Sequence, residues 1–244
     1  MTGRNPGAFR STAMAVIAYG IAMGFLEATV VVYLRAAMGL APAGLVPVHD
    51  TAAFGAFAGV EVARELATLV MIAAVGWLAG RSGLERLAWA AVVFGAWDIV
   101  YYIGLRFLIG WPASPAAWDV LFVVPVPWVG PVLAPLVVSA ALVGFGLAAA
   151  RRLRAGRTIV VGPPRALAAL AGGGLVVLSF LVDSNRVLAG DESAWTGWPL
   201  FGAGMALALG ATAAALAGPS RAIASGGVSP DHGTGGRPPA GSPE

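Results

Sequence analysis

Residues 87–107 read LAWAAVVFGAWDIVYYIGLRF. A hydrocarbon core about 30 Å thick is crossed by about 20 helical residues, and this apolar run has that length. One acidic residue, Asp98, lies inside the run. The stretch therefore predicts a transmembrane helix that carries an ionisable side chain within the membrane.

The whole chain has the composition of a membrane protein. Hydrophobic residues make up 58% of it and charged residues 11%, whereas a soluble domain carries about 25% charged residues. So few charges cannot cover the surface of a soluble protein of this size, so a lipid-facing surface is expected. We predict an all-α polytopic bundle with about six spans, at residues 15–34, 52–79, 85–107, 129–150, 166–183 and 199–217.

The arginines predict the orientation of this bundle. They gather in the N-terminus (Arg4 and Arg10) and in the linkers after the second and fourth spans, whereas residues 35–50, 108–128 and 183–198 hold few of them. By the positive-inside rule, both termini are expected in the cytoplasm. The first apolar run is longer than the core of a signal peptide, which has about 7–15 residues, so an uncleaved helix is favoured.

The chain is expected to divide into one transmembrane domain, residues 1–218, and a tail, residues 219–244. The tail is rich in Gly, Ser and Pro. Such a composition cannot bury a core, so the tail is predicted to be disordered.

The segment between the third and fourth spans reads GWPASPAAWDVLFVVPVPWVGP. Ser114 suits a helix N-cap, Pro115 suits the first helical position, and Pro125 disfavours helix before it. We therefore predict a short helix over residues 115–124, about 15 Å long, that is interfacial or re-entrant. The interfacial form is favoured because tryptophans gather at membrane surfaces, and the segment holds Trp111, Trp118 and Trp128.

Ionisable residues within spans are costly and indicate either a functional site or a buried pair. Measured along their helices, Glu27, Glu65 and Asp98 lie about 10, 8 and 13 Å below the same outer boundary. Helical spacing places them on stripes where spans one to three are expected to meet, around a polar pocket open to the outside. The candidate pocket comprises Glu27, Glu61, Arg64, Glu65, Asp98, Tyr101 and Tyr102, and its candidate roof comprises Arg35, Arg106, Trp118, Asp119 and Trp128.

Acids outnumber basic residues at this depth. Arg64 is the basic residue at the level of the acids, and Arg35 and Arg106 could extend inwards from the outer edge. Surplus carboxylates in a low dielectric must be protonated, hydrated or bound to a cation. The alternative interpretation is a paired network that only locks three helices together.

Four stretches together resemble a group of uncharacterised bacterial integral membrane proteins. They are GFLEATVVVYLR (24–35), EVARELATLVMI (61–72), FGAWDIVYYIGLR (94–106) and WDVLFVVPVPWVGPVLAP (118–135). The resemblance covers roughly residues 20–135 and implies a location in the bacterial inner membrane. It brings no activity or cofactor with it.

Several kinds of site are excluded by the sequence. The chain has no cysteine and two histidines, His49 and His232, of which the second lies in the tail. A site with two or more imidazole ligands is therefore close to excluded, and so are thiolate sites. Phosphate loops with a lysine, His-Glu-x-x-His motifs and Gly-x-Ser-x-Gly elbows are all missing from the sequence.

Three functions remain open at this level. Binding or translocation of a small solute or cation is the leading expectation, since surplus acids share one depth. A membrane-embedded enzyme acting on a lipid-type substrate would use the same acids to hold a divalent metal or as acid and base. A non-catalytic scaffold would need them only as a dry network. The expected partners are the bilayer and a small ligand, and nucleic acid is not expected because the arginines gather at helix ends.

Overall fold

The computed structural model describes residues 6–39, 51–191 and 193–218 of the chain, with side chains from residue 7 in the first helix and residue 59 in the second. Six helices in this part are long and apolar enough to cross a membrane, so the protein is an all-α polytopic bundle, as predicted. They are α1 (Pro6–Ala37), α2 (Thr51–Ala79), α3 (Gly83–Ile109), α4 (Leu133–Arg154), α5 (Pro163–Leu181) and α7 (Trp198–Ala217), with a short α6 (Ser184–Leu188) after α5. His49 and the tail from residue 219 lie outside the described residues.

The segment before α4 corrects the sequence prediction. Residues 115–124 form no helix; β1 (Trp118–Phe122) pairs antiparallel with β2 (Trp128–Pro131), and Val120 lies opposite Val129. Ser114 opens a single turn, in which the Ala117 N–H donates to its carbonyl at 3.0 Å. The fourth helix accordingly begins at Leu133, not at residue 129.

The residues explain why the hairpin replaces the helix. Val, Leu and Phe around residues 120–124 favour a pleated strand, and Pro125 and Pro127 lie in the reversal between the strands. Two paired strands satisfy one another's backbone groups. A ten-residue helix in an apolar setting would instead leave groups at both ends without partners.

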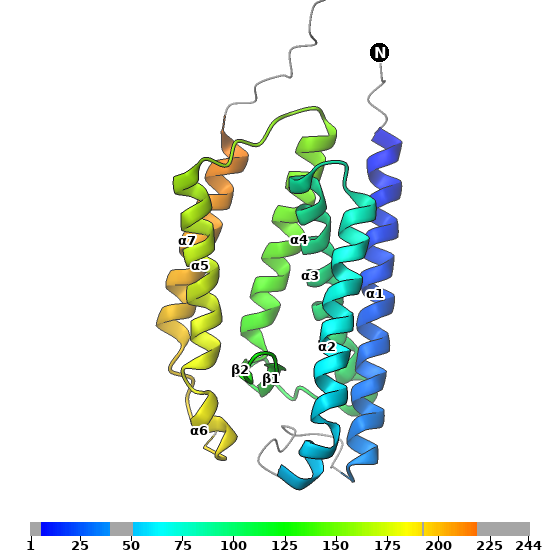
Figure 1. Cartoon of the computed structure of the whole chain (residues 1–244), viewed down its shortest axis with the longest axis vertical. Helices are drawn as coiled ribbons and strands as arrows, with labels where there is room; N and C mark the ends of the chain where they lie inside the picture. The colour runs from blue at the N-terminus through cyan, green and yellow to red at the C-terminus, as the bar shows by residue number, and fades with distance from the viewer. Residues whose placement is uncertain (1–5, 40–50, 192, 219–244) are drawn as a thin grey trace, which may run out of the picture.

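The helices form two groups. Figure 1 shows α5 and α7 side by side, and α1 to α4 packed together on the other side, with the hairpin between the groups near the end away from the chain termini. Glycines permit close packing within each group. A Cβ on Gly24 of α1 would lie 2.4 Å from the Trp97 carbonyl of α3, and one on Gly172 of α5 would lie 2.7 Å from the Gly204 carbonyl of α7. Gly20 and Gly24 of α1 therefore lie directly against α3.

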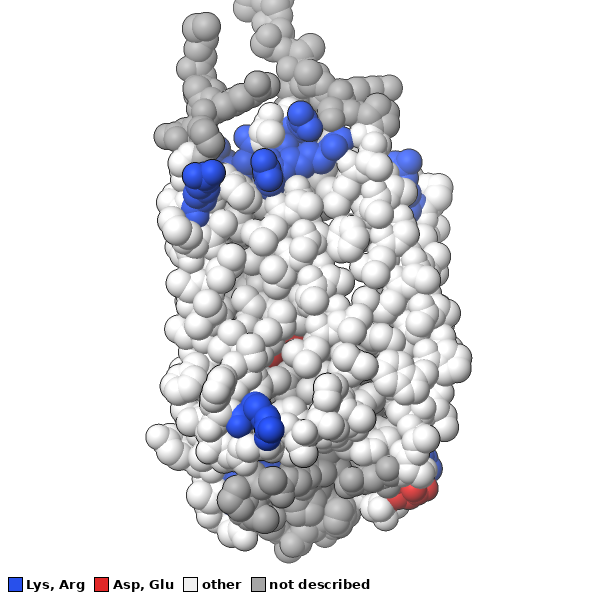
Figure 2. All heavy atoms as spheres, turned by 180° about the vertical axis from the view of Figure 1, so that it is seen from behind, with Lys and Arg blue, Asp and Glu red and all other residues white. Residues whose placement is uncertain are grey.

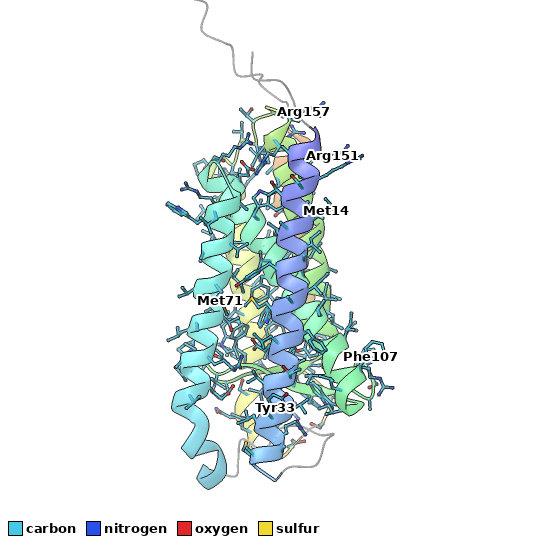
Figure 3. All side chains as sticks on the ribbon, turned by 90° about the vertical axis from the view of Figure 1, so that its right-hand side faces the viewer. Met14, Tyr33, Met71, Phe107, Arg151 and Arg157 are labelled. Carbon is cyan, nitrogen blue, oxygen red and sulfur yellow. The ribbon has the colours of Figure 1, made fainter. Side chains whose placement is uncertain are left out.

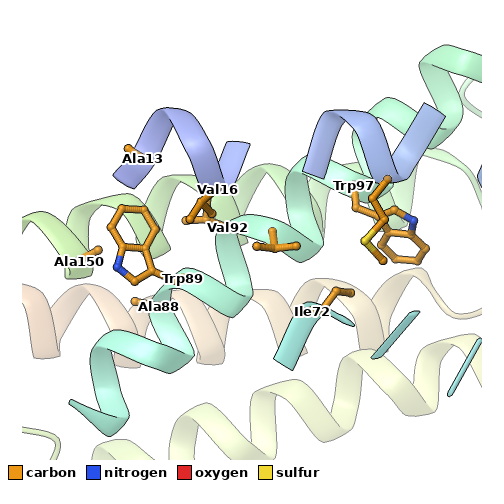
Figure 4. Close-up of a cluster of buried hydrophobic side chains, with 10 residues drawn as sticks. Ala13, Val16, Ile72, Ala88, Trp89, Val92, Trp97 and Ala150 are labelled. Carbon is orange, nitrogen blue, oxygen red and sulfur yellow. The ribbon is translucent and has the colours of Figure 1, made fainter. Parts of the chain in front are cut away.

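Helix α3 is the centre of the larger group. Its Trp89, Val92 and Val93 are fully buried, and Figure 4 shows Trp89 and Val92 among side chains of α1, α2 and α4. The outer surface of the bundle is apolar, unlike the surface of a soluble protein. Met14, Tyr33 and Phe107, labelled in Figure 3, are exposed by 65%, 72% and 84%. This inside-out pattern is the one expected of a lipid-facing surface.

Basic side chains gather at one end of the bundle, where α1 begins and α7 ends (Figure 2). We call this the arginine-rich end, and it holds Arg81, Arg86, Arg151, Arg152, Arg154, Arg157 and Arg165. The opposite end is the hairpin end. The alternation of helix directions agrees with the predicted topology, and the cytoplasmic location of the arginine-rich end stays a prediction.

Candidate functional site

Arg64 of α2 lies between two acids. Its guanidinium contacts Glu27 of α1 and lies 2.9 Å from Glu61, one helical turn away on α2. Glu27 also accepts hydrogen bonds from the Thr68 hydroxyl and the Trp97 indole, both at 3.3 Å. This Arg64 cluster (Glu27, Glu61, Arg64 and Thr68) therefore joins α1, α2 and α3, and carries one more carboxylate than guanidinium.

Glu65 has a different role. Its carboxylate accepts the Val123 N–H at the end of β1, at 2.9 and 3.1 Å from its two oxygens. On the far side of the hairpin, the Ser184 hydroxyl donates to the Pro127 carbonyl at 2.9 Å. Backbone groups within a membrane need such partners. Glu65 and Ser184 thus hold the hairpin between the two helix groups.

Asp98 faces away from the Arg64 cluster, towards α4. Its carboxylate accepts a hydrogen bond from the buried Ser139 hydroxyl at 2.8 Å. The close approach of α4 depends on Gly95, one turn earlier on α3, because a Cβ there would lie 2.4 Å from the Ser139 carbonyl. An electrostatic interaction still relates Asp98 to Glu27 through the width of α3. The structure therefore divides the predicted pocket between two sides of one helix.

A third set of polar side chains surrounds Asp119 of the hairpin. Its carboxylate accepts from the Tyr102 hydroxyl at 2.8 Å and from the Val120 N–H at 2.9 Å. Burial raises the pKa of Asp119 to about 7, and its bonds to Tyr102 and Val120 and the charge of Arg35 act in the opposite direction. Tyr101 packs edge-on against Tyr102, with ring centroids 5.0 Å apart. Asp119 and Arg35 therefore lie beside α3 and not above an open pocket.

The remaining predicted roof residues separate as well. Arg106 is exposed and donates to the carbonyl of Gly110 at the end of its own helix. Trp118 and Trp128 pack instead against the aromatic cluster of α5 and α7. The Trp128 indole nitrogen is buried and has no hydrogen-bond partner among the described residues.

A large cavity lies between the two helix groups. It has a volume of about 580 Å³ and is lined by α3, α4, α5, α7 and the hairpin. It extends from Arg165 and Leu216 near the arginine-rich end to Trp128 and Phe180 near the hairpin end. Nearly all its lining is apolar, and the polar side chains in its wall are Asp98, Ser139, Arg165, Thr212 and the indole of Trp128.

The sequence did not predict this cavity. Its walls consist of residues that are ordinary on the apolar face of a membrane helix, and it exists only because two groups of helices stand apart. A weak signal was present in the small residues of α5 that face it, Ala169 and Gly173.

A second missed feature is an ion pair at the arginine-rich end. Arg154 of α4 pairs with Glu85 of α3 and donates to the Ala79 carbonyl of α2 at 2.8 Å. Glu85 also accepts from the Trp89 indole at 3.2 Å. Glu85 lies between Arg81 and Arg86 in the sequence. An acid among arginines could have indicated the pair, which ties three helices together.

A shared metal site finds no support in residues 6–39, 51–191 and 193–218, where no three acidic or histidine side chains converge as ligands. Among the predicted pocket acids, Glu27 and Glu61 share Arg64, whereas Glu65 and Asp98 accept from Val123 and Ser139. The predicted roof acid Asp119 accepts from Tyr102.

The chain matches no protein-family model, no curated protein and no solved structure. Its function must therefore be argued from geometry.

Proposed function

We propose that this integral membrane protein binds a lipid-type amphiphile, with one apolar chain in the cavity between α3–α4 and α5–α7. The observation that carries the proposal is the size and lining of that cavity. Its 580 Å³ accommodates on the order of 20 non-hydrogen atoms, if each takes about 30 Å³, the volume of a water molecule in the liquid. That is the size of one hydrocarbon chain.

The length of the cavity supports the same ligand. Its lining on α5 runs from Arg165 to Phe180, which corresponds to about 22 Å of helix. This is roughly two thirds of a hydrocarbon core about 30 Å thick. A chain lying along α5 would therefore be parallel to the lipids around the protein.

The few polar groups in the wall fit a binding site. Ligand pockets are mainly apolar, with a small number of fixed polar groups that orient the ligand. Asp98 and Ser139 are such a pair, and Asp98 lies about 16 Å from the end of α3 at Ile109. Their mutual hydrogen bond of 2.8 Å satisfies both side chains and leaves acceptor positions on the carboxylate for a polar group of the ligand.

The second candidate is binding or translocation of a small solute or cation at the Arg64 cluster. It is favoured by the surplus carboxylate there, because Glu27 and Glu61 share one guanidinium. It is the weaker candidate because Glu65, Asp98 and Asp119 are each held by other donors. In both cases we propose a bacterial inner membrane with the arginine-rich end in the cytoplasm, following the positive-inside rule.

Two neighbouring glycines of α5 allow a matched test. Gly173 lines the cavity and Gly174 does not, and a Cβ on either would meet nothing within 4 Å. Gly173→Leu therefore fills the cavity without a backbone clash, and Gly174→Leu adds the same side chain outside it. Both remove a glycine from a helix interior, so their effects on helix propensity are alike.

The probe is palmitoyl-oleoyl phosphatidylcholine, titrated into delipidated protein and counted by native mass spectrometry. We expect Gly173→Leu to weaken binding about 10-fold, which is the loss of about 1.4 kcal/mol, and Gly174→Leu to leave it unchanged. Equal affinities in the two variants would reject the cavity as the site. Cation-dependent stabilisation that is lost in Glu61→Gln would favour the second candidate.

A further inference from the structure

Two arginines approach Gly218 at the arginine-rich end of the cavity, which we call its mouth. Arg165, on the first turn of α5, lines the cavity and is exposed. Arg152, near the end of α4, donates to the carbonyl of Gly218, which follows α7. A Cβ on Gly218 would lie 3.9 Å from the Arg165 guanidinium. Guanidinium groups from two of the helices that enclose the cavity thus approach the end of a third.

The segment from the end of α4 to the start of α5 is basic, and none of its own residues carries a negative charge. Residues 151–165 contain arginines at positions 151, 152, 154, 157 and 165 and no acid. Arg154 is paired with Glu85 of α3. The apolar residues Ile159 and Val161 of the same segment line the cavity. Positive charge and apolar lining therefore adjoin at this mouth.

We infer that the cavity selects amphiphiles with an anionic phosphate headgroup, held by Arg165 and Arg152, with the chain extending towards the hairpin. This inference rests on the proposed function and adds the chemical class of the headgroup. Basic pockets between transmembrane helices bind anionic lipid headgroups. The planar guanidinium suits this role because it can donate two parallel hydrogen bonds to phosphate oxygens.

The positions of the two ends agree with this orientation. Arg165 lies at the start of α5, where a helix leaves the hydrocarbon core, and Phe180 lies about 22 Å further along. A headgroup at Arg165 and a chain end near Phe180 would place the polar and apolar parts of the ligand in matching surroundings.

The test compares two lipids with identical chains, palmitoyl-oleoyl phosphatidylglycerol and palmitoyl-oleoyl phosphatidylcholine, in delipidated protein by native mass spectrometry. We expect the natural protein to prefer the anionic lipid about 10-fold. Arg165→Gln and Arg152→Gln should each reduce this preference at least 5-fold, because phosphatidylglycerol loses more affinity than phosphatidylcholine, whose choline cation already compensates its phosphate. Arg165→Lys keeps the charge and should retain most of the preference.

Arg151→Gln is the matched control. Arg151, labelled in Figure 3, neighbours Arg152 on the same helix, is exposed and does not line the cavity. Its replacement removes the same charge from the same end and should leave the preference intact. A preference that is absent, or that falls equally in the Arg151 and Arg165 variants, would overturn the inference, since general surface charge would then explain it.

Inorganic phosphate forms a third arm of the experiment. Millimolar phosphate should not displace the anionic lipid, because the chain contributes to its binding. Displacement by phosphate alone would overturn the inference in favour of a site for free phosphate. The result is separable from the proposed function: Gly173→Leu weakens both lipids alike and leaves their ratio unchanged if the cavity binds chains, whereas Arg165→Gln lowers the ratio between them.

Discussion

The Arg64 cluster and the cavity lie on opposite sides of α3, and they differ in how their polar groups are used. In the cluster, ionisable side chains are dense and each has a nearby partner, as Glu27 has in Arg64. In the cavity, polar groups are few and the space is large. The comparison teaches that conspicuous charges within a membrane can serve mainly to hold helices and a hairpin in place, while an unremarkable apolar surface encloses the room for a ligand.

The largest effect should come from removing the cation of the cluster. Arg64→Met leaves Glu27 and Glu61 without their shared guanidinium, and breaking a largely buried pair costs about 3 kcal/mol. We expect the free energy of unfolding in detergent to fall by about this amount, while the affinity for phosphatidylcholine is retained once the protein is folded. Arg64→Lys is the control and should lose less. Loss of lipid binding without loss of stability would place the ligand at the cluster after all.

Glu65 tests whether an acid of this region supports the hairpin. Glu65→Ala removes the acceptor for the Val123 N–H, and an unsatisfied buried donor costs about 1–3 kcal/mol. Glu65→Gln keeps a carbonyl oxygen and should lose less than half as much. Chemical unfolding of both variants measures the difference. If the two variants proved equally destabilised, the negative charge would matter and not the hydrogen bond to the hairpin.

The stability of the folded protein should depend on pH because of Asp119. Its pKa of about 7 in the folded protein is above the usual value of about 3.9, so the folded state binds more protons between these values. Stability should therefore decline as the pH rises from about 4 to about 7. Asp119→Asn should remove most of this decline, as followed by unfolding at several pH values. A variant with the unchanged pH profile would show that other groups cause the decline.

Trp128→Phe should have the smallest effect on stability. The indole nitrogen of Trp128 has no partner among the described residues, so the variant loses packing area but no hydrogen bond within the chain. We expect a change in the free energy of unfolding below about 1 kcal/mol. A larger loss would indicate that the indole N–H is satisfied within the folded protein.

Much of the fold follows from the sequence, because length and hydropathy are local properties. The spans at residues 85–107 and 199–217 correspond to α3 and α7 within a few residues. The hairpin was missed because Ser114 and Pro115 are also typical of a helix start, and only the partner strand and Glu65 decide between the two forms. The residues of this segment alone favour a helix start and a strand about equally. Contacts with residues distant in sequence decide for the hairpin.

The site was less predictable than the fold. Helical spacing placed Asp98 on a stripe of α3 that was expected to face spans one and two, but α3 has neighbours on both sides, and the sequence does not tell which neighbour a stripe faces. Asp98 meets Ser139 of α4, whereas Trp97 meets Glu27 of α1. The cavity depends on the separation of two helix groups, for which no local pattern exists.

Photolabelling in bilayers shows whether a hydrocarbon chain occupies the cavity. The probe is a phosphatidylcholine with a photoactivatable group at the end of one acyl chain, and the labelled residues are identified by mass spectrometry. The account predicts labels on cavity-lining residues such as Leu142, Val177 and Met205, and their loss in Gly173→Leu. Labels confined to the exposed outer residues of α5, such as Leu167, Leu170 and Leu178, would contradict it.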